Sequence, residues 1–193
     1  MGQDSDGIWR ITKCVCTNDQ CKKVIVELVL VNPKSGKISQ LIVNPRASNR
    51  PISPLVPKIF ATDFIEACIV LPDSAKASAA LSRRCLQNLL REVAKVKQAD
   101  LYKEIQDIID SRTLPSYLSE NLDAIRVIGN FAAHPTKSTN SGEIIEVEPG
   151  EAEWNLDVLE GLFDFYFVQP TLMKKKKDAL NKKLGDAGKP PIK

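Results

Sequence analysis

Residues 118–134 read LSENLDAIRVIGNFAAH and are followed by Pro135. Apolar side chains recur in it at steps of three and four residues, at Leu118, Leu122, Ile125 and Ile128. This spacing predicts a helix with one buried face. Since proline cannot continue a helix, we expect the helix to end at residue 134.

A polar row follows a neighbouring strip of the same helix. Arg126, Asn130 and His134 are four residues apart, so each side chain is rotated by only about 40° from the one before. His134 is the single histidine of the chain. A guanidinium, an amide and an imidazole together can bind an anion and transfer a proton near neutral pH. The three residues are therefore candidates for a catalytic site; a polar row of this kind is more often a solvated face or a buried network that ties helices together.

Composition favours a soluble, cytoplasmic protein. With 193 residues, 43% of them hydrophobic, the chain can bury a core, and we expect one domain with an appendage. No run approaches the roughly 20 apolar residues that cross a bilayer, so we expect no membrane association. The first residues, MGQDSDG, are polar and acidic, unlike a secretory signal, and the odd number of cysteines, five, suits a reducing compartment.

Charge is distributed unevenly. Residues 171–193 contain eight lysines and two aspartates, a net charge of +6, which leaves −3 for residues 1–170 within the total of +3. We predict a basic tail over residues 171–193 that is first a solvated, disordered extension. The second interpretation is a nucleic-acid arm, in which Lys174, Lys175, Lys176 and Lys177 contact phosphates.

Residues 1–54 favour β structure. β-branched and apolar residues over 8–14, 23–31 and 37–43 predict three strands, and 32–36 (NPKSG) supplies a turn between the last two. Four prolines within residues 44–58 predict an extended linker.

Helical periodicity begins after the linker. We predict a first helix over 63–71, capped by Thr62 and ended by Pro72. A second helix should begin at Asp73 or Ser74 and bury an apolar row that includes Cys85 and Leu89. We expect a third helix over 99–111 and a fourth from Pro115 through the quoted stretch. A possible strand at 143–148 precedes a fifth helix over 151–168. This helix is rich in aromatic residues, and its apolar surface extends so far around it that we expect burial against two surfaces, one of which could belong to a second subunit; the alternative is ordinary core.

Two further groups are candidate sites. Cys14, Cys16 and Cys21 resemble half of a zinc ribbon, but zinc requires four ligands, so we expect a degenerate ribbon without metal. Arg83 and Arg84 could approach Arg126 and bind substrate if their helix packs antiparallel to the quoted one. Alternatively, Arg83 pairs with Asp123 or Glu66 and Arg84 lies in solvent. We predict no cofactor.

Two helical segments together resemble the domain-of-unknown-function family 4145 (DUF4145): SAALSRRCLQNLL at 78–90 and IRVIGNFAAH at 125–134. That family is similar to the HEPN superfamily, helical bundles that often dimerise and often cleave RNA without a metal. The resemblance implies a HEPN-like (DUF4145) domain over 55–170. In the usual HEPN signature four to six residues separate arginine and histidine, whereas seven separate Arg126 from His134.

We therefore expect a mainly α protein, a HEPN-like bundle of four to five helices with a small β-rich N-terminal segment. The resemblance implies a prokaryotic, defence-related or nucleic-acid-associated homodimer, and possible metal-independent endoribonuclease activity. His134 would then transfer protons, Arg126 would stabilise phosphorane-like charge and Asn130 would orient the substrate. The alternative is a non-catalytic module that docks on nucleic acid or on a larger defence or restriction enzyme, with the Arg/Asn/His row structural.

Overall fold

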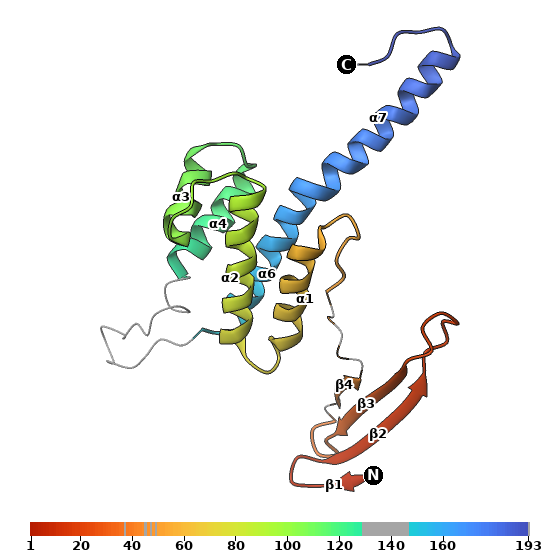
Figure 1. Cartoon of the computed structure of the whole chain (residues 1–193). Coiled ribbons are helices and arrows are strands. Elements are labelled where there is room, and N and C mark those ends of the chain that lie inside the picture. The colour runs from red at the N-terminus through yellow and green to blue at the C-terminus, as the bar shows by residue number, and fades with distance from the viewer. Residues whose placement is uncertain (37, 45, 47, 49, 129–146, 193) are drawn as a thin grey trace. The chain divides into compact units, whose positions relative to one another are not determined.

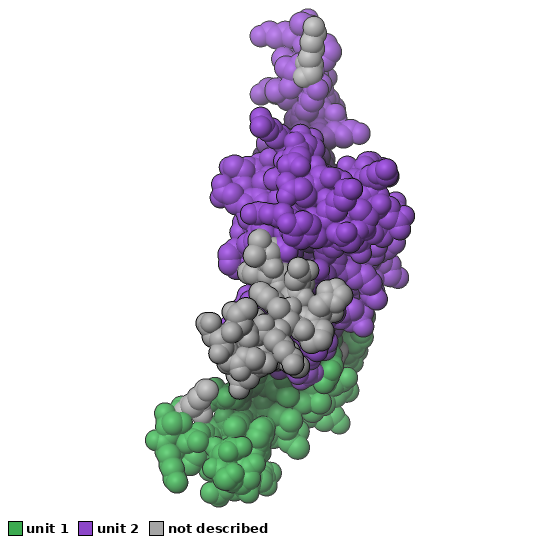
Figure 2. Space-filling model, turned by 90° about the vertical axis from the view of Figure 1, so that its left-hand side faces the viewer, with its two compact units in different colours: residues 1–49 green, residues 50–193 purple. Residues whose placement is uncertain are grey.

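The computed structural model describes residues 1–36, 38–44, 46, 48, 50–128 and 147–192. The chain divides into two compact units, residues 1–49 and 50–193 (Figures 1 and 2). The first contains a small antiparallel sheet and the second is helical, which confirms the mainly α prediction with a β-rich N-terminal segment.

The N-terminal sheet has the strand order β1-β2-β3-β4, and each strand is antiparallel to the next. The strands are Gly2–Gln3 (β1), Ile8–Val15 (β2), Val24–Val31 (β3) and Ile38–Asn44 (β4). The three predicted strands are confirmed to within one residue at each end, whereas β1 was not predicted. The predicted turn is also confirmed, because the Gly36 amide donates to the Asn32 carbonyl oxygen at 2.9 Å.

Gly7 is required just before β2, where the chain lies against the end of β3. Its φ is +146°, and a Cβ there would lie 2.4 Å from the Val31 carbonyl oxygen. Only glycine avoids both the strain and the clash. No described apolar side chain of this unit is buried, and Ile11 and Ile38 are 71% and 65% exposed.

The helical unit contains Lys58–Val70 (α1), Ala75–Glu92 (α2), Leu101–Asp110 (α3), Ser116–Ile128 (α4), Pro149–Phe163 (α6), the π-helical segment Asp164–Val168 (η1) and Gln169–Asp186 (α7). The predicted cap of α2 is confirmed, since Ser74 Oγ accepts from the Ala77 amide at 3.2 Å. The predicted start of α1 is wrong. Pro57 precedes the helix, and Thr62 lies inside it, with its hydroxyl donating to the Lys58 carbonyl oxygen.

The core forms where α2 packs against α1, α3 and α6, and where α4 packs against α3 and α6 (Figure 1). Leu118, Leu122 and Ile125 are all buried, as the spacing of the quoted stretch predicted. Between α4 and α6, a Cβ on Gly161 would lie 2.9 Å from Leu118 Cδ2. Glycine at this position therefore permits the close packing of the two helices.

The C-terminal helix continues beyond the predicted end at Val168. α6 passes through η1 into α7 without a break, so the prediction of disorder is wrong for residues 171–186 (Figure 1). Pro170 lacks an amide hydrogen, and the wider π turn before it lets the Gln169 amide bond to the Asp164 carbonyl oxygen, five residues back. The packed α6 nucleates the helix, and the lysines and leucines that follow have high helix propensity.

Two arginines of α2 form ion pairs with neighbouring helices, one on the surface and one in the interior. On the surface, Arg84 pairs with Asp63 of α1 at 2.7 Å. In the interior, Arg91 Nε donates to Glu104 Oε1 of α3 at 2.7 Å, and the same oxygen accepts from the Ala99 amide at 2.8 Å. Because the Glu104 side chain is fully buried, its negative charge depends on these partners.

Replacing Arg91 by methionine is expected to lower the free energy of unfolding by about 3–5 kcal/mol, because it leaves a buried carboxylate without its cation. Arg84→Met, which breaks the exposed pair, is the matched control and should cost at most about 1 kcal/mol. Urea unfolding followed by far-UV circular dichroism measures both. Equal losses would contradict a special role for the buried pair.

Candidate functional site

Arg126 is the member of the predicted catalytic row whose position the structure gives. Its Nε and Nη2 atoms lie 2.8 and 2.7 Å from Asp123 Oδ1 on the same helix. Its Nη1 donates to the Tyr102 hydroxyl at 2.6 Å, and its Cζ lies 4.6 Å from the centre of the Tyr102 ring. The guanidinium is therefore neutralised by a carboxylate and stacked on an aromatic ring, an arrangement that fixes α4 to α3. Asn130 and His134 lie outside the described residues.

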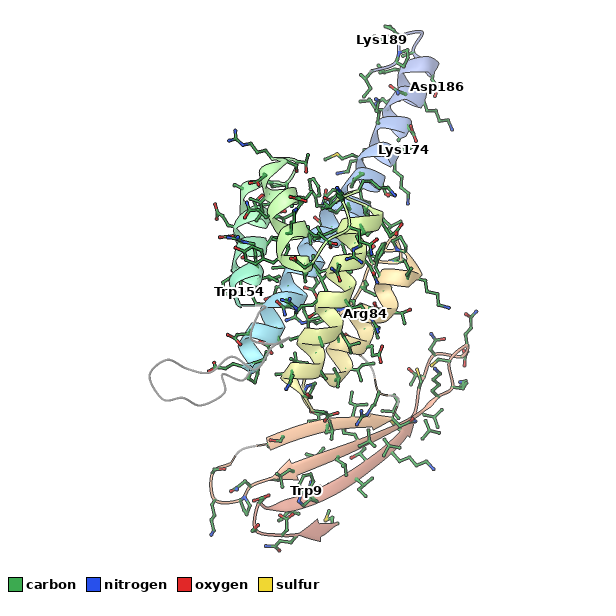
Figure 3. The ribbon with its side chains drawn as sticks, turned by 60° about the vertical axis from the view of Figure 1, so that its left-hand side comes forward. Trp9, Arg84, Trp154, Lys174, Asp186 and Lys189 are labelled. Carbon is green, nitrogen blue, oxygen red and sulfur yellow. The ribbon has the colours of Figure 1, made fainter. Side chains whose placement is uncertain are left out.

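Arg83 and Arg84 do not form a cationic patch with Arg126 among the described residues, because α2 does not pack on the described part of α4. In the alternative that we considered, the carboxylate pairing of Arg83 is wrong for the described residues, whereas Arg84 is exposed to solvent, as that alternative expected. Arg84, shown in Figure 3, makes two hydrogen bonds to Asp63 and lies 4.0 Å from Glu66. These hydrogen bonds raise the pKa of Arg84.

Arg83 has a different environment from its neighbour. Burial lowers the pKa of its guanidinium, and it makes no hydrogen bond or ion pair with any residue that the structure describes. A partly buried cation without a carboxylate partner can accept an anionic ligand with less competition than Arg84. Of the predicted substrate-binding arginines, Arg83 is thus the better candidate.

The lysines of α7 are exposed and form no ion pair with described residues. Lys174, Lys175, Lys176 and Lys177 occupy successive positions and therefore point in different directions around the helix, at about 100° intervals. Lys182 and Lys183 add a second group one to two turns further on. Figure 3 shows Lys174 and Asp186 on α7. The helix thus presents positive charge on several sides at once.

The three N-terminal cysteines are free, and no group of three or more possible metal ligands occurs among the described residues. A hydrogen bond from the Lys23 backbone, and a further one with Cys16, lower the pKa of the Cys21 thiol. Cys68 and Cys85 are buried in the helical core, and burial raises the pKa of Cys85 to about 12.

A hollow of about 300 Å³, which was not predicted from the sequence, lies between α4 and α6. Tyr117, Asn121 and Trp154 line it, together with Asp157 and Gly161. Beside it, Arg50 lies within ion-pair distance of Asp157 and 3.4 Å from Glu160. The spacing of acidic residues at 153, 157, 160 and 164 was visible in the sequence and marks this exposed side of α6.

The described residues form a mainly helical protein that has an N-terminal four-stranded antiparallel sheet and a lysine-rich C-terminal helix. The chain belongs to the family described as "Domain of unknown function (DUF4145)", which it matches over residues 66–183. This confirms the predicted family, and the match extends well into α7. No curated protein and no solved structure matches the chain. None of the described helices combines the length and hydrophobicity that a membrane span requires.

Alkylation with iodoacetamide should distinguish Cys21 from Cys85 by the pH at which each thiol reacts. Because its pKa is lowered, Cys21 should react at a lower pH than a cysteine in an unstructured peptide, whereas Cys85 should remain unmodified until the protein unfolds. Peptide mass spectrometry across a pH series measures both, and Cys16→Ala should move the Cys21 profile to higher pH. Rapid labelling of native Cys85 would be the contrary result.

Proposed function

We propose that this protein binds nucleic acid through electrostatic contacts between α7 and the phosphate backbone. The observation that supports this function is the set of exposed α7 lysines, none of which has a carboxylate partner among the described residues. The aspartates of the same region do not neutralise them, since residues 171–193 carry a net charge of +6.

The chemistry of α7 favours binding that is independent of base sequence. Lysine acts as a compact point charge toward phosphate, and displacement of counterions from the nucleic acid then drives association. Residues 171–193 contain no aromatic side chain on which bases could stack. A bound strand would therefore be held by its backbone.

Metal-independent RNA cleavage is a second candidate function, in which the helical unit is a HEPN-like bundle. Arg83 favours it, because a partly buried guanidinium without a described carboxylate partner can bind a phosphate near the core. His134 would act as the acid–base group for the ribose 2′-hydroxyl, with Asn130 orienting the substrate. Arg126, held by Asp123 and Tyr102, would position α4 rather than bind the phosphate itself.

The contacts of Arg126 favour the non-catalytic alternative over cleavage, since they resemble a structural tie between helices. In that case the protein is an interaction module, and nucleic-acid binding by α7 remains its function. A defence role and a larger restriction-type partner are implied only by the HEPN resemblance and stay predictions.

Nucleic-acid binding should weaken steeply as salt rises. Replacing Lys174, Lys175, Lys176 and Lys177 together by glutamine should reduce affinity for single- and double-stranded probes by roughly tenfold or more at low salt and flatten the salt dependence. Fluorescence anisotropy of labelled oligonucleotides measures both quantities. Replacing Lys13, Lys22, Lys23 and Lys34 of the N-terminal unit by glutamine is the control with the same charge change. Equal loss from both variants, or no salt dependence, would argue against α7 as the binding element.

RNA cleavage is tested separately, by incubating the full chain with total RNA in EDTA. If the second candidate is right, the protein nicks RNA, and His134→Ala abolishes the activity without lowering the melting temperature. Arg83→Gln should reduce cleavage by about 10²-fold or more, through lost stabilisation of transition-state charge. If RNA stays intact with the wild-type protein, the catalytic candidate is excluded and the binding function is unaffected.

A further inference from the structure

Two cysteines that the proposed function does not use lie together in the loop between β2 and β3 (Figure 1). Cys16 continues the pairing of the two strands, since its amide donates to the Lys23 carbonyl oxygen at 2.9 Å. Cys21 lies at the other end of the stretch CTNDQC, and its thiol makes a side-chain hydrogen bond with Cys16. The fold therefore brings two thiols side by side at the end of a hairpin.

The backbone of the loop holds this pair of thiols in place. The Asn18 carbonyl oxygen accepts from the amides of Cys21 and Lys22 at 2.9 and 3.1 Å, which closes a tight turn. The Asn18 side chain also accepts from the Gln20 amide at 3.0 Å. Lys22 has a φ of +45°, and this left-handed residue turns the chain into β3. The position of Cys21 relative to Cys16 is thus set by hydrogen bonds in which neither thiol takes part.

Cys21 is the more reactive member of the pair. Its side chain is exposed, whereas Cys16 is half-buried. A hydrogen bond from the Lys23 backbone, the hydrogen bond with Cys16 and the positive charge of Lys23 all favour the thiolate and lower the pKa of Cys21. An accessible thiolate beside a second thiol is the arrangement that responds to oxidants, because the first cysteine is oxidised and the second then reacts with it.

The remaining cysteines are not placed to take part. Cys14 is exposed on β2, but no group of three possible metal ligands occurs among the described residues, so it does not form a cluster with the other two. Cys68 and Cys85 are buried in the helical core. Cys16 is therefore the thiol that is available to Cys21.

We propose that Cys16 and Cys21 form a reversible redox site, at which a hydroperoxide converts the two thiols into an intramolecular disulfide. The Cys21 thiolate attacks one peroxide oxygen, the O–O bond breaks, and the other oxygen leaves as hydroxide. The Cys16 sulfur then attacks the Cys21 sulfenic acid, so that an S–S bond forms and the S–O bond breaks. The departing hydroxide takes up the Cys16 proton as water.

The reaction is balanced without any further reactant. With hydrogen peroxide, the two thiols together lose two hydrogen atoms and the peroxide is reduced to two molecules of water. A thiol reductant reverses the change by exchange with the disulfide.

This redox site goes beyond the proposed nucleic-acid binding and does not depend on it. The disulfide would close a loop in the N-terminal unit, whereas the lysines that are proposed to contact phosphates lie on α7 of the helical unit. The two proposals are therefore tested by separate measurements.

Peptide mass spectrometry after treatment of the full chain with hydrogen peroxide near neutral pH tests the redox site. Iodoacetamide in denaturant labels the remaining thiols, and trypsin should then release residues 14–22, CVCTNDQCK, which contain all three N-terminal cysteines. After oxidation this peptide should lack two hydrogen atoms and carry one alkyl group, which fragmentation should locate on Cys14. Dithiothreitol before alkylation should restore three alkyl groups. Cys68 and Cys85 should be fully alkylated throughout.

Serine variants assign the two roles. Cys16→Ser should stop the reaction at the Cys21 sulfenic acid, which dimedone traps, because the second thiol is missing. Cys21→Ser should slow the oxidation of Cys16 by at least roughly tenfold, since the more reactive thiolate is lost. Cys14→Ser is the matched control, two residues from Cys16, and should leave formation of the disulfide unchanged.

A wild-type peptide that still carries three alkyl groups after peroxide treatment would overturn the proposal. So would a disulfide that includes Cys14 or that joins two chains, or equal loss of the disulfide from Cys14→Ser and Cys16→Ser. None of these results would affect the salt-dependent binding of nucleic acid, so the redox site can fail while the proposed function stands.

Discussion

A buried carboxylate fixes the arrangement of three helices. Glu104 lies on α3 and accepts hydrogen bonds from Arg91 of α2 and from the Ala99 amide in the segment that joins α2 to α3. Without these partners its burial would be strongly unfavourable, so α3 can pack on α2 only in the position that provides them. Tyr102 lies two residues before Glu104 and holds Arg126 of α4. The position of Arg126 on α4 therefore depends on the ion pair between Arg91 of α2 and Glu104 of α3.

The C-terminal helix extends well beyond the bundle that nucleates it. Phe163 packs against Phe64 at 5.5 Å, and Phe167 stacks on Phe60 at 5.6 Å, so α1 holds the helix through the π segment. Beyond that point no described side chain of α7 is buried. Its helical form keeps six lysines at fixed spacing, and this regular spacing supports the proposed contacts with phosphates. A disordered tail would offer the same charge without that geometry.

Arginines at different depths illustrate how burial changes the role of one residue type. Arg84 is exposed and paired, Arg91 supports a buried carboxylate, and Arg126 is stacked and paired. Arg83 alone among these four has no polar partner among the described residues. Since a guanidinium remains charged at neutral pH, this unpaired cation is the one best able to interact with a phosphate.

Most of the local structure could be predicted from the amino-acid sequence. The periods of apolar residues predicted the strands and most helices, Ser74 marked the start of α2, and two short segments identified the family. These features depend on neighbours within a few residues. The partner of each arginine could be seen only in the folded protein, because Arg84 and Asp63, like Tyr102 and Arg126, lie more than 20 residues apart. The continuation of the helix past Pro170 also required it, because aromatic packing against α1 stabilises a turn that the proline alone would interrupt.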